Sequence, residues 1–162
     1  MGEDKTSRDI VSEIKEKFGE SVAHVSNEAI TTLLVDKAKV FEVALTLKEK
    51  GFDHLSDVTV VDYIKEKEFE LIYHLWSHRA KRRVMLKTRV QRSEALMKSF
   101  TSLWSSAQMH ERECHEMFGL NFDGNPDLSP LLLEDWDEIP PLRKDFDSRK
   151  YVLEKFYGGE RE

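Results

Sequence analysis

Residues 58–90 decide the fold, and they read VTVVDYIKEKEFELIYHLWSHRAKRRVMLKTRV. Three runs rich in β-branched and aromatic residues lie in this stretch, separated by short charged segments: residues 58–64, 69–78 and 83–90. In the middle run every second residue is apolar from Phe69 to Leu75, which is the period of a β-strand. Charged segments this short are typical of turns between paired strands. We therefore predict three consecutive antiparallel strands.

The flanking sequence adds helices and two further strands. The predicted elements around the three central strands are a helix at 6–18, strands at 22–25 and 29–35, a helix that stops at Gly51, and one or two helices over 93–118. This order, α-β-β-α-β-β-β-α, predicts an α+β fold. Its sheet should be mixed but mainly antiparallel, with the helices packed on one face.

The chain is acidic, with a formal net charge of −6 and 35% charged residues. This balance argues against free nucleic acid as the main partner. No apolar run approaches the roughly 20 residues needed to span a bilayer, and the first eight residues lack the apolar core of a signal peptide. The single cysteine excludes an internal disulfide and fits a reducing cytoplasm. Few amide side chains beside many Lys and Glu residues are typical of hyperthermophile proteins.

The C-terminal part has a different composition. Residues 111–146 read ERECHEMFGLNFDGNPDLSPLLLEDWDEIPPLRKDF and contain all four prolines of the chain. Because proline lacks a backbone donor, the stretch beyond Gly119 can form neither a long helix nor a central strand. It is nevertheless rich in Leu, Phe and Trp, which need a surface to bury against. We expect residues 1–118 to form a globular domain and residues 119–162 to form an extended tail that docks on a partner.

The same stretch resembles the signature of the 30 kDa subunit family of respiratory complex I. The matching segments, in order, are Glu111-Arg112-Glu113, Met117-Phe118-Gly119, Gly124-Asn125-Pro126-Asp127-Leu128, Trp136 and Pro141-Leu142-Arg143-Lys144-Asp145-Phe146. Among the departures from the family pattern, His115 stands where an Asp is usual and Asn125 replaces a His. These departures indicate a divergent branch, such as that of membrane-bound energy-converting hydrogenases and related archaeal complexes.

The resemblance implies a subunit without chemistry of its own. It implies a non-catalytic scaffold in the electron-transfer arm of a complex I-like, membrane-bound oxidoreductase, either a membrane-bound [NiFe]-hydrogenase or a sulfur-reducing sibling. The alternative within the family is the 30 kDa subunit of a quinone-reducing NADH or F420H2 dehydrogenase.

The resemblance also implies where partners and cofactors lie. The implied partners are a hydrogenase-type large subunit and an iron–sulfur small subunit, which would hold the [4Fe–4S] clusters and a NiFe centre. This chain would hold no cofactor. It would lie on the cytoplasmic side of the cell membrane, associated with the membrane only through its partners.

This interpretation assigns no catalytic, cofactor-binding or metal-binding residue. The implied partner interface consists of Glu111, Arg112, Glu113, Phe118, Gly119, Pro126, Asp127, Leu128, Trp136, Pro141, Leu142, Arg143, Lys144, Asp145 and Phe146. Phe118, Leu128, Trp136 and Phe146 would be its apolar anchors, since buried aromatic and Leu side chains dominate such contacts. The charged members would fix the register through paired hydrogen bonds.

A small metal-dependent enzyme is one alternative from another class. His110 and Cys114 are one helical turn apart, and Glu111 could add a third ligand. No Cys-x-x-Cys or His-Glu-x-x-His pattern accompanies them, and one cysteine cannot hold an iron–sulfur cluster. The simpler interpretation is a buried thiol flanked by surface histidines.

An RNA-binding module is another alternative. His74, Trp76 and His78 precede the basic run at 79–83, and aromatic residues beside cations are typical of single-strand binding. A solvated turn is the simpler interpretation, and a docking surface for an acidic partner would use the same residues. Similarly, Glu111, Glu113 and Glu116 could act as acid–base groups, but ion-paired surface carboxylates are the simpler interpretation.

Overall fold

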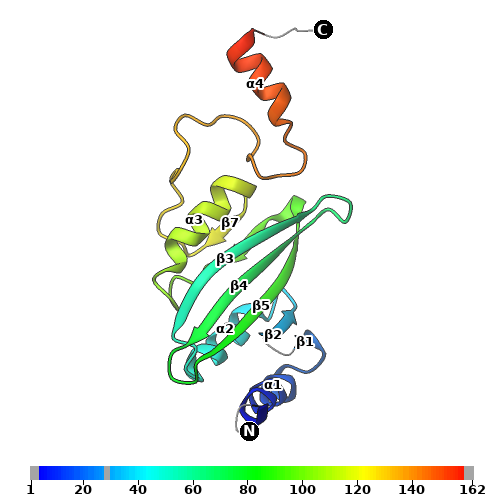
Figure 1. Ribbon diagram of the computed structural model, residues 1–162, viewed down its shortest axis with the longest axis vertical. Helices are drawn as coiled ribbons and strands as arrows, with labels where there is room; N and C mark the ends of the chain where they lie inside the picture. Colours follow the sequence, from blue (N-terminus) through cyan, green and yellow to red (C-terminus); the bar gives the residue numbers. More distant parts are fainter. Residues whose placement is uncertain (1–3, 28–29, 159–162) are drawn as a thin grey trace.

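A computed structural model describes residues 4–27 and 30–158. In chain order the elements are α1 (Asp4–Phe18), β1 (Val22–Asn27), β2 (Ile30–Val35), α2 (Val40–Glu49), β3 (His54–Tyr63), β4 (Glu68–Ser77), β5 (Arg82–Gln91), β6 (Leu96–Lys98), α3 (Ala107–Phe118), β7 (Asn121–Asp123) and α4 (Ser148–Tyr157). The predicted α+β class is confirmed (Figure 1). None of the helices in the described ranges is long and apolar enough to cross a membrane.

The main sheet has five strands in the order β1-β2-β5-β4-β3. Only the β2–β5 pair is parallel, so the sheet is mixed and mainly antiparallel, as predicted. Tyr73 in β4 lies opposite Val58 in β3 and Leu86 in β5. Because side chains alternate along a strand, this register brings the apolar residues of the three central strands onto one face.

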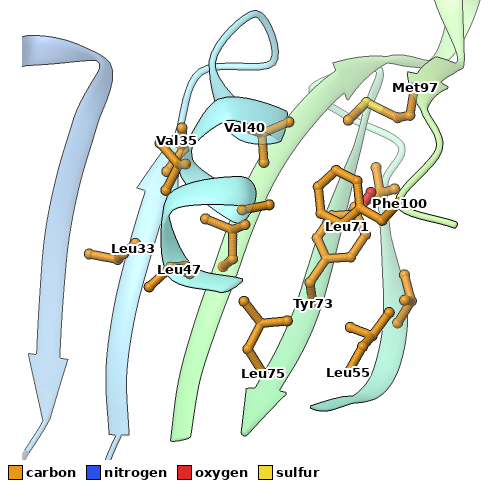
Figure 2. Packing of buried hydrophobic residues seen from close by; sticks show 14 of the residues in the cluster. Leu33, Val35, Val40, Leu47, Leu55, Leu71, Tyr73, Leu75, Met97 and Phe100 are labelled. Carbon is orange, nitrogen blue, oxygen red and sulfur yellow. The ribbon is translucent and has the colours of Figure 1, made fainter. Parts of the chain in front are cut away.

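That face carries the core. α2 buries Val43 and Leu47 against the sheet, and Tyr73 stacks on Phe100 with ring centroids 4.3 Å apart (Figure 2). α3 packs on β3, where the Cys114 Sγ donates a weak hydrogen bond to the backbone oxygen of Val58 at 3.5 Å. Burying each large apolar side chain contributes roughly 1.5–3 kcal/mol, so the covered face dominates the stability of the domain.

The prediction of helix throughout residues 93–118 is wrong in its first half. Arg92–Glu94 forms a short 3-10 turn, β6 follows, and α3 begins only at Ala107. β6 pairs in parallel with β7, so backbone groups of this segment bond to a strand far along the sequence. This long-range pairing overrides local helix propensity.

The chain also ends differently from the prediction. Residues 148–157, expected to belong to an extended tail, form helix α4. The Asp147 side chain accepts a hydrogen bond from the backbone N–H of Lys150 at 3.0 Å and so caps the helix. Gly158 closes it in the left-handed conformation, with φ of 68°.

Candidate partner-binding site

The chain passes the predicted domain boundary at residue 118 without leaving the core. Gly119 ends α3 with φ of 78°, and its N–H donates to the carbonyl of His115 at 2.8 Å. Leu120 and Phe122 are then buried, and β7 pairs with β6. The tail therefore leaves the globular core only after Phe122.

Glu111 is an internal residue, not a surface one. Its side chain is fully buried, and its carboxylate accepts hydrogen bonds from the Ser99 hydroxyl (2.7 Å), the Phe100 N–H (2.7 Å) and the Asn125 side-chain amide (2.8 Å). Burial raises the pKa of Glu111, an effect that these three donors oppose. The expectation that Glu111 is an ion-paired surface residue, or that it contacts a partner, is corrected, because its side chain points from α3 into the core. Through Asn125, it positions the first residues of the tail.

A first polar clasp holds the tail against the outer side of α3. The Arg112 guanidinium donates to the carbonyls of Ser129 (3.0 Å) and Pro130 (2.9 Å). The Glu116 carboxylate accepts the three successive N–H groups of residues 131–133, at 2.8–3.2 Å. Charge-assisted hydrogen bonds of this kind are stronger than neutral ones. The tail backbone is therefore fixed although its prolines prevent regular pairing.

A second polar clasp lies where β3 ends. The Asp62 carboxylate accepts the N–H of Lys144 at 2.8 Å and pairs with Arg92 at 3.1 Å. Arg92 also pairs with Asp145 at 2.8 Å, and Arg143 binds the same carboxylate through two of its nitrogens. The hydrogen bonds from Arg143 hold the pKa of Asp145 far below its usual range. Arg143, Lys144 and Asp145, all predicted interface residues, thus bind the chain's own domain.

Two of the four predicted apolar anchors face inward. Phe118 packs edge-on against Phe69, with ring centroids 6.2 Å apart, and Leu128 packs against the core cluster. Both side chains are half-buried in the isolated chain. Their main contacts are therefore within the domain.

The other two anchors join the tail to α4. Trp136 lies 5.5 Å from Phe146 and 4.9 Å from Tyr151 between ring centroids, and Phe146 lies 5.7 Å from Tyr151. The Trp136 indole N–H donates to the carbonyl of Ile139 at 3.2 Å. These half-buried rings form a small aromatic cluster that sets where α4 lies on the tail.

Six of the exposed large apolar side chains in the described ranges lie along the tail and α4: Leu132, Ile139, Leu142, Val152, Phe156 and Tyr157. Phe156 is 70% exposed. Of these six, the sequence analysis included only Leu142 in the implied interface, and it left out the three on α4 because that helix was not predicted. The signal was present in Asp147, a good N-cap residue, followed by ten residues that end at a glycine.

The remaining predicted interface residues occupy varied positions. Glu113 and Pro126 are exposed, Pro141 is half-buried, and Asp127 pairs with Arg112 at 3.5 Å. All of them lie on α3 or on the tail. The candidate site is therefore a tail that two polar clasps attach to the domain and that also carries exposed apolar side chains.

The metal-ligand candidates do not converge. His110 Nδ1 lies 3.7 Å from an Asp57 carboxylate oxygen, whereas Cys114 faces the backbone of Val58. Burial raises the pKa of Cys114 far above that of a free thiol, so it stays protonated. In residues 4–27 and 30–158 no group of three or more His, Cys, Asp or Glu side chains could hold a metal ion.

The family model described as "Respiratory-chain NADH dehydrogenase, 30 Kd subunit" matches residues 33–152. The chain belongs to this family. It is 36% identical over 149 residues to a subunit of the F420H2 dehydrogenase of Methanosarcina mazei, covering 87% of this chain and 92% of that one. It is also 36% identical over 118 residues to a subunit of the NADH-quinone oxidoreductase of Moorella thermoacetica, covering 72% and 80% of the two chains.

Solved structures extend the likeness to the whole fold. A chain of the membrane-bound sulfane sulfur reductase, an archaeal respiratory membrane complex, matches with a TM-score of 0.84 and 31% identity. The match covers 97% of this chain and 95% of that chain, so it includes the tail and α4. The trypsin-resistant fragment 1–134 of Nqo5 matches 75% of this chain with a TM-score of 0.67 and 24% identity, which supports the fold alone.

Proposed function

We propose that this chain is a non-catalytic scaffold subunit in the electron-transfer arm of a complex I-like, membrane-bound oxidoreductase. Family membership makes it a subunit of a multi-subunit oxidoreductase. In the proposal, the tail and α4 dock on a hydrogenase-type large subunit, close to an iron–sulfur small subunit. The partners carry the [4Fe–4S] clusters and any NiFe centre. The chain lies on the cytoplasmic side of the membrane and is attached through those partners.

The proposal rests mainly on the exposed apolar side chains of a tail that two polar clasps already hold in place. Ordering a flexible segment on binding costs free energy, so a preformed surface binds more tightly for the same contacts. A proline-containing tail with exposed apolar anchors could instead become ordered only when it binds a partner. The clasps favour a tail that is docked on its own domain before it meets a partner.

A sulfur-reducing complex is the preferred setting. The similarity to the chain from the sulfane sulfur reductase complex covers almost the full length of both chains. An F420H2 dehydrogenase or a quinone-reducing NADH dehydrogenase is the second candidate, favoured by the 36% identity to the Methanosarcina mazei protein. Purifying the complex through a tag on this chain and sequencing its subunits separates the settings. A large subunit with two Cys-x-x-Cys pairs indicates a hydrogenase.

Docking through α4 can be tested without disturbing the core. Val152 and Phe156 lie one turn apart and are 42% and 70% exposed, so Val152→Asp with Phe156→Asp leaves the packing of the domain unchanged. We expect co-purification of the large subunit to fall by at least about tenfold, because carboxylates would be buried in an apolar contact.

Leu45→Asp is the matched control, because Leu45 is an equally apolar helix residue, 40% exposed, on α2. It should leave co-purification unchanged. Circular dichroism checks that each variant is folded. Full retention of the large subunit by the folded α4 variant would rule out α4 as a docking element.

A further inference from the structure

Within the part of the chain that the structure describes, one face of the main sheet is not covered by a helix (Figure 1). Leu71, Tyr73 and Leu75 of β4 are completely buried on the core face, whereas Ile72 and Trp76, which point the other way, are only half-buried. Met85 of β5 is also half-buried on this second face and lies beside β4. We call this the open face. Apolar side chains in such a position are typical of a surface that is covered in an assembly.

Cations gather at one end of the open face, in the turn between β4 and β5. This basic hairpin comprises His78, Arg79, Lys81, Arg82 and Arg83. Arg79 and Lys81 are exposed and form no ion pair with any residue in the described ranges. On the open face itself, Lys87 pairs with Glu70 at 3.1 Å, which balances its charge. The hairpin is therefore a local excess of positive charge on a chain whose net charge is −6.

The hairpin is held rigidly. The Ser77 hydroxyl accepts the N–H of Ala80 at 3.2 Å, and the Asp53 carboxylate accepts the N–H of His78 at 3.2 Å. The His78 ring also lies 3.0 Å from the same carboxylate. Lys81 adopts a positive φ of 51°, which closes the turn. Because the backbone of the turn is already fixed, only the side chains of Arg79 and Lys81 have to be ordered on binding.

The electrostatics of a neighbouring histidine agree with this geometry. Burial lowers the pKa of His74, and the charges of Arg83 and Lys87 lower it further, although Asp57 acts in the opposite direction. Burial is the largest cause, so the lowered pKa reports mainly that the His74 ring is partly withdrawn from water on the open face, where charges of both signs act on it.

We propose that the basic hairpin and the adjoining open face, with Ile72, Trp76 and Met85, form a second docking surface for an acidic surface of another protein subunit. Trp, Met and Arg are enriched at the centre of protein interfaces. The Asp53 carboxylate lies 3.0 Å from the His78 ring and interrupts the positive charge, so a compact acidic patch on a protein fits the hairpin better than a continuous polyanion such as RNA does. The inference rests on the proposed function only in requiring that the chain is part of a larger complex.

This second surface lies far from the second clasp, and it is on the opposite face of the sheet from α3, which carries the first clasp. The second clasp binds Asp62, near the end of β3 that leads into β4, whereas the hairpin lies at the opposite end of β4. A ten-residue strand spans about 30 Å. One partner on the tail and α4 therefore leaves the hairpin free for another contact, and the two docking surfaces can fail separately.

A zero-length carbodiimide cross-linker applied to the intact complex tests the proposal, because it joins an ammonium group to a carboxylate only where the two already touch. We expect Lys81 to be linked to an Asp or Glu of another subunit, identified by mass spectrometry of the linked peptides. The proposal would be overturned if Lys81 formed no link to another subunit and a lysine-acetylating reagent modified Lys81 equally in the complex and in the free chain.

Charge reversal gives the second readout. Arg79→Glu with Lys81→Glu should lower retention of the cross-linked subunit by at least about tenfold. Lys65→Glu with Lys67→Glu is the matched control. Lys67 has the same unusual backbone conformation as Lys81, with φ of 59°, in the turn at the other end of β4, and the charge change is identical. Equal loss of that subunit from both variants would contradict a local docking surface.

Other anionic partners are distinguished with the isolated chain. Binding to a single-stranded RNA 20-mer, or to vesicles containing anionic phospholipid, should be weak and unaffected by the hairpin variant. Binding that is tight at moderate salt and disappears on charge reversal would assign the hairpin to that other partner and refute the protein surface.

Discussion

Glu111 illustrates how a single buried carboxylate links pH to stability. A carboxyl with a raised pKa in the folded chain binds its proton more tightly there than in the unfolded chain. Its contribution to stability is therefore fully present below the unfolded pKa and is lost as pH rises through the folded pKa. The protonated form is favoured in the folded chain because a charged carboxylate at this buried position would lose its hydration.

Glu111→Gln should remove this pH dependence. Glutamine keeps an oxygen that accepts the Phe100 N–H, so the variant should fold. Relative to the wild type, its free energy of unfolding should improve as pH rises above about 4, the unfolded pKa of a Glu side chain, and should level off once pH passes the raised pKa of the folded carboxyl. Urea unfolding at a series of pH values measures the difference. Glu113→Gln, an exposed position on the same helix, is the control, and a parallel pH profile for wild type and Glu111→Gln would contradict the argument.

Gly119 carries a second constraint at the scale of one residue. Its φ of 78° disfavours any L-residue, and an added Cβ would lie 3.2 Å from the Cγ of Pro140 in the tail. Gly119→Ala should therefore cost more than the roughly 1–2 kcal/mol of left-handed backbone strain. Gly19→Ala is the control, because Gly19 has φ of 57° but no atom within 4 Å of such a Cβ. Equal loss of stability in thermal unfolding of the two variants would show that the tail does not press on Gly119.

At the scale of the element, segments with a clear local period were predicted and segments that depend on distant contacts were missed. The alternation of Phe69, Leu71 and Tyr73 requires only a period of two, and β4 appears where it was predicted. Residues 96–98 form a strand only because β7 lies beside them, which no local pattern indicates. The burial of Glu111 was missed for the same reason, because its donors Ser99 and Asn125 are distant in sequence.

Sequence reasoning could not separate internal contacts from an interface, for a related reason. Arg143 and Asp145 were expected to form paired hydrogen bonds with a partner, but they pair with each other, and Asp145 also pairs with Arg92 of the same chain. A sequence motif shows that residues act together, but not on which side of a contact they lie. The exposed residues of α4 carry no family motif and became visible only once the helix was seen.

A substitution of Glu116 tests whether the first clasp holds the tail on the domain. Its carboxylate accepts three backbone N–H groups, and glutamine can replace at most one oxygen as an acceptor. Glu116→Gln should raise the opening equilibrium of residues 131–133 by about tenfold, which is the effect of losing roughly one charge-assisted hydrogen bond. Hydrogen–deuterium exchange of these amides in the free chain measures it. Unchanged exchange relative to Glu113→Gln would mean that the first clasp does not hold the tail.

At the scale of the whole molecule, the sheet separates two surfaces. The tail and α4 extend from one end of it, and the basic hairpin lies at the other (Figure 1). A rigid, mainly antiparallel sheet with a buried face is suited to hold two contacts at a fixed separation, because core packing resists deformation. In its proposed role the chain holds no redox centre. It could still affect the activity of a complex, because it would hold two partners at a fixed separation.

The separation predicts additive effects. Perturbations more than about 10 Å apart without shared contacts add in free energy. The α4 variant, Val152→Asp with Phe156→Asp, should release the large subunit, and the hairpin variant, Arg79→Glu with Lys81→Glu, should release the subunit that cross-links to Lys81. With all four substitutions, the fraction of complexes that keep both subunits should fall by the product of the two single losses, as measured by native mass spectrometry of complexes purified from matched strains. If each variant instead releases both subunits to the same extent, the two surfaces bind one continuous partner, and the sheet is not a spacer between two contacts.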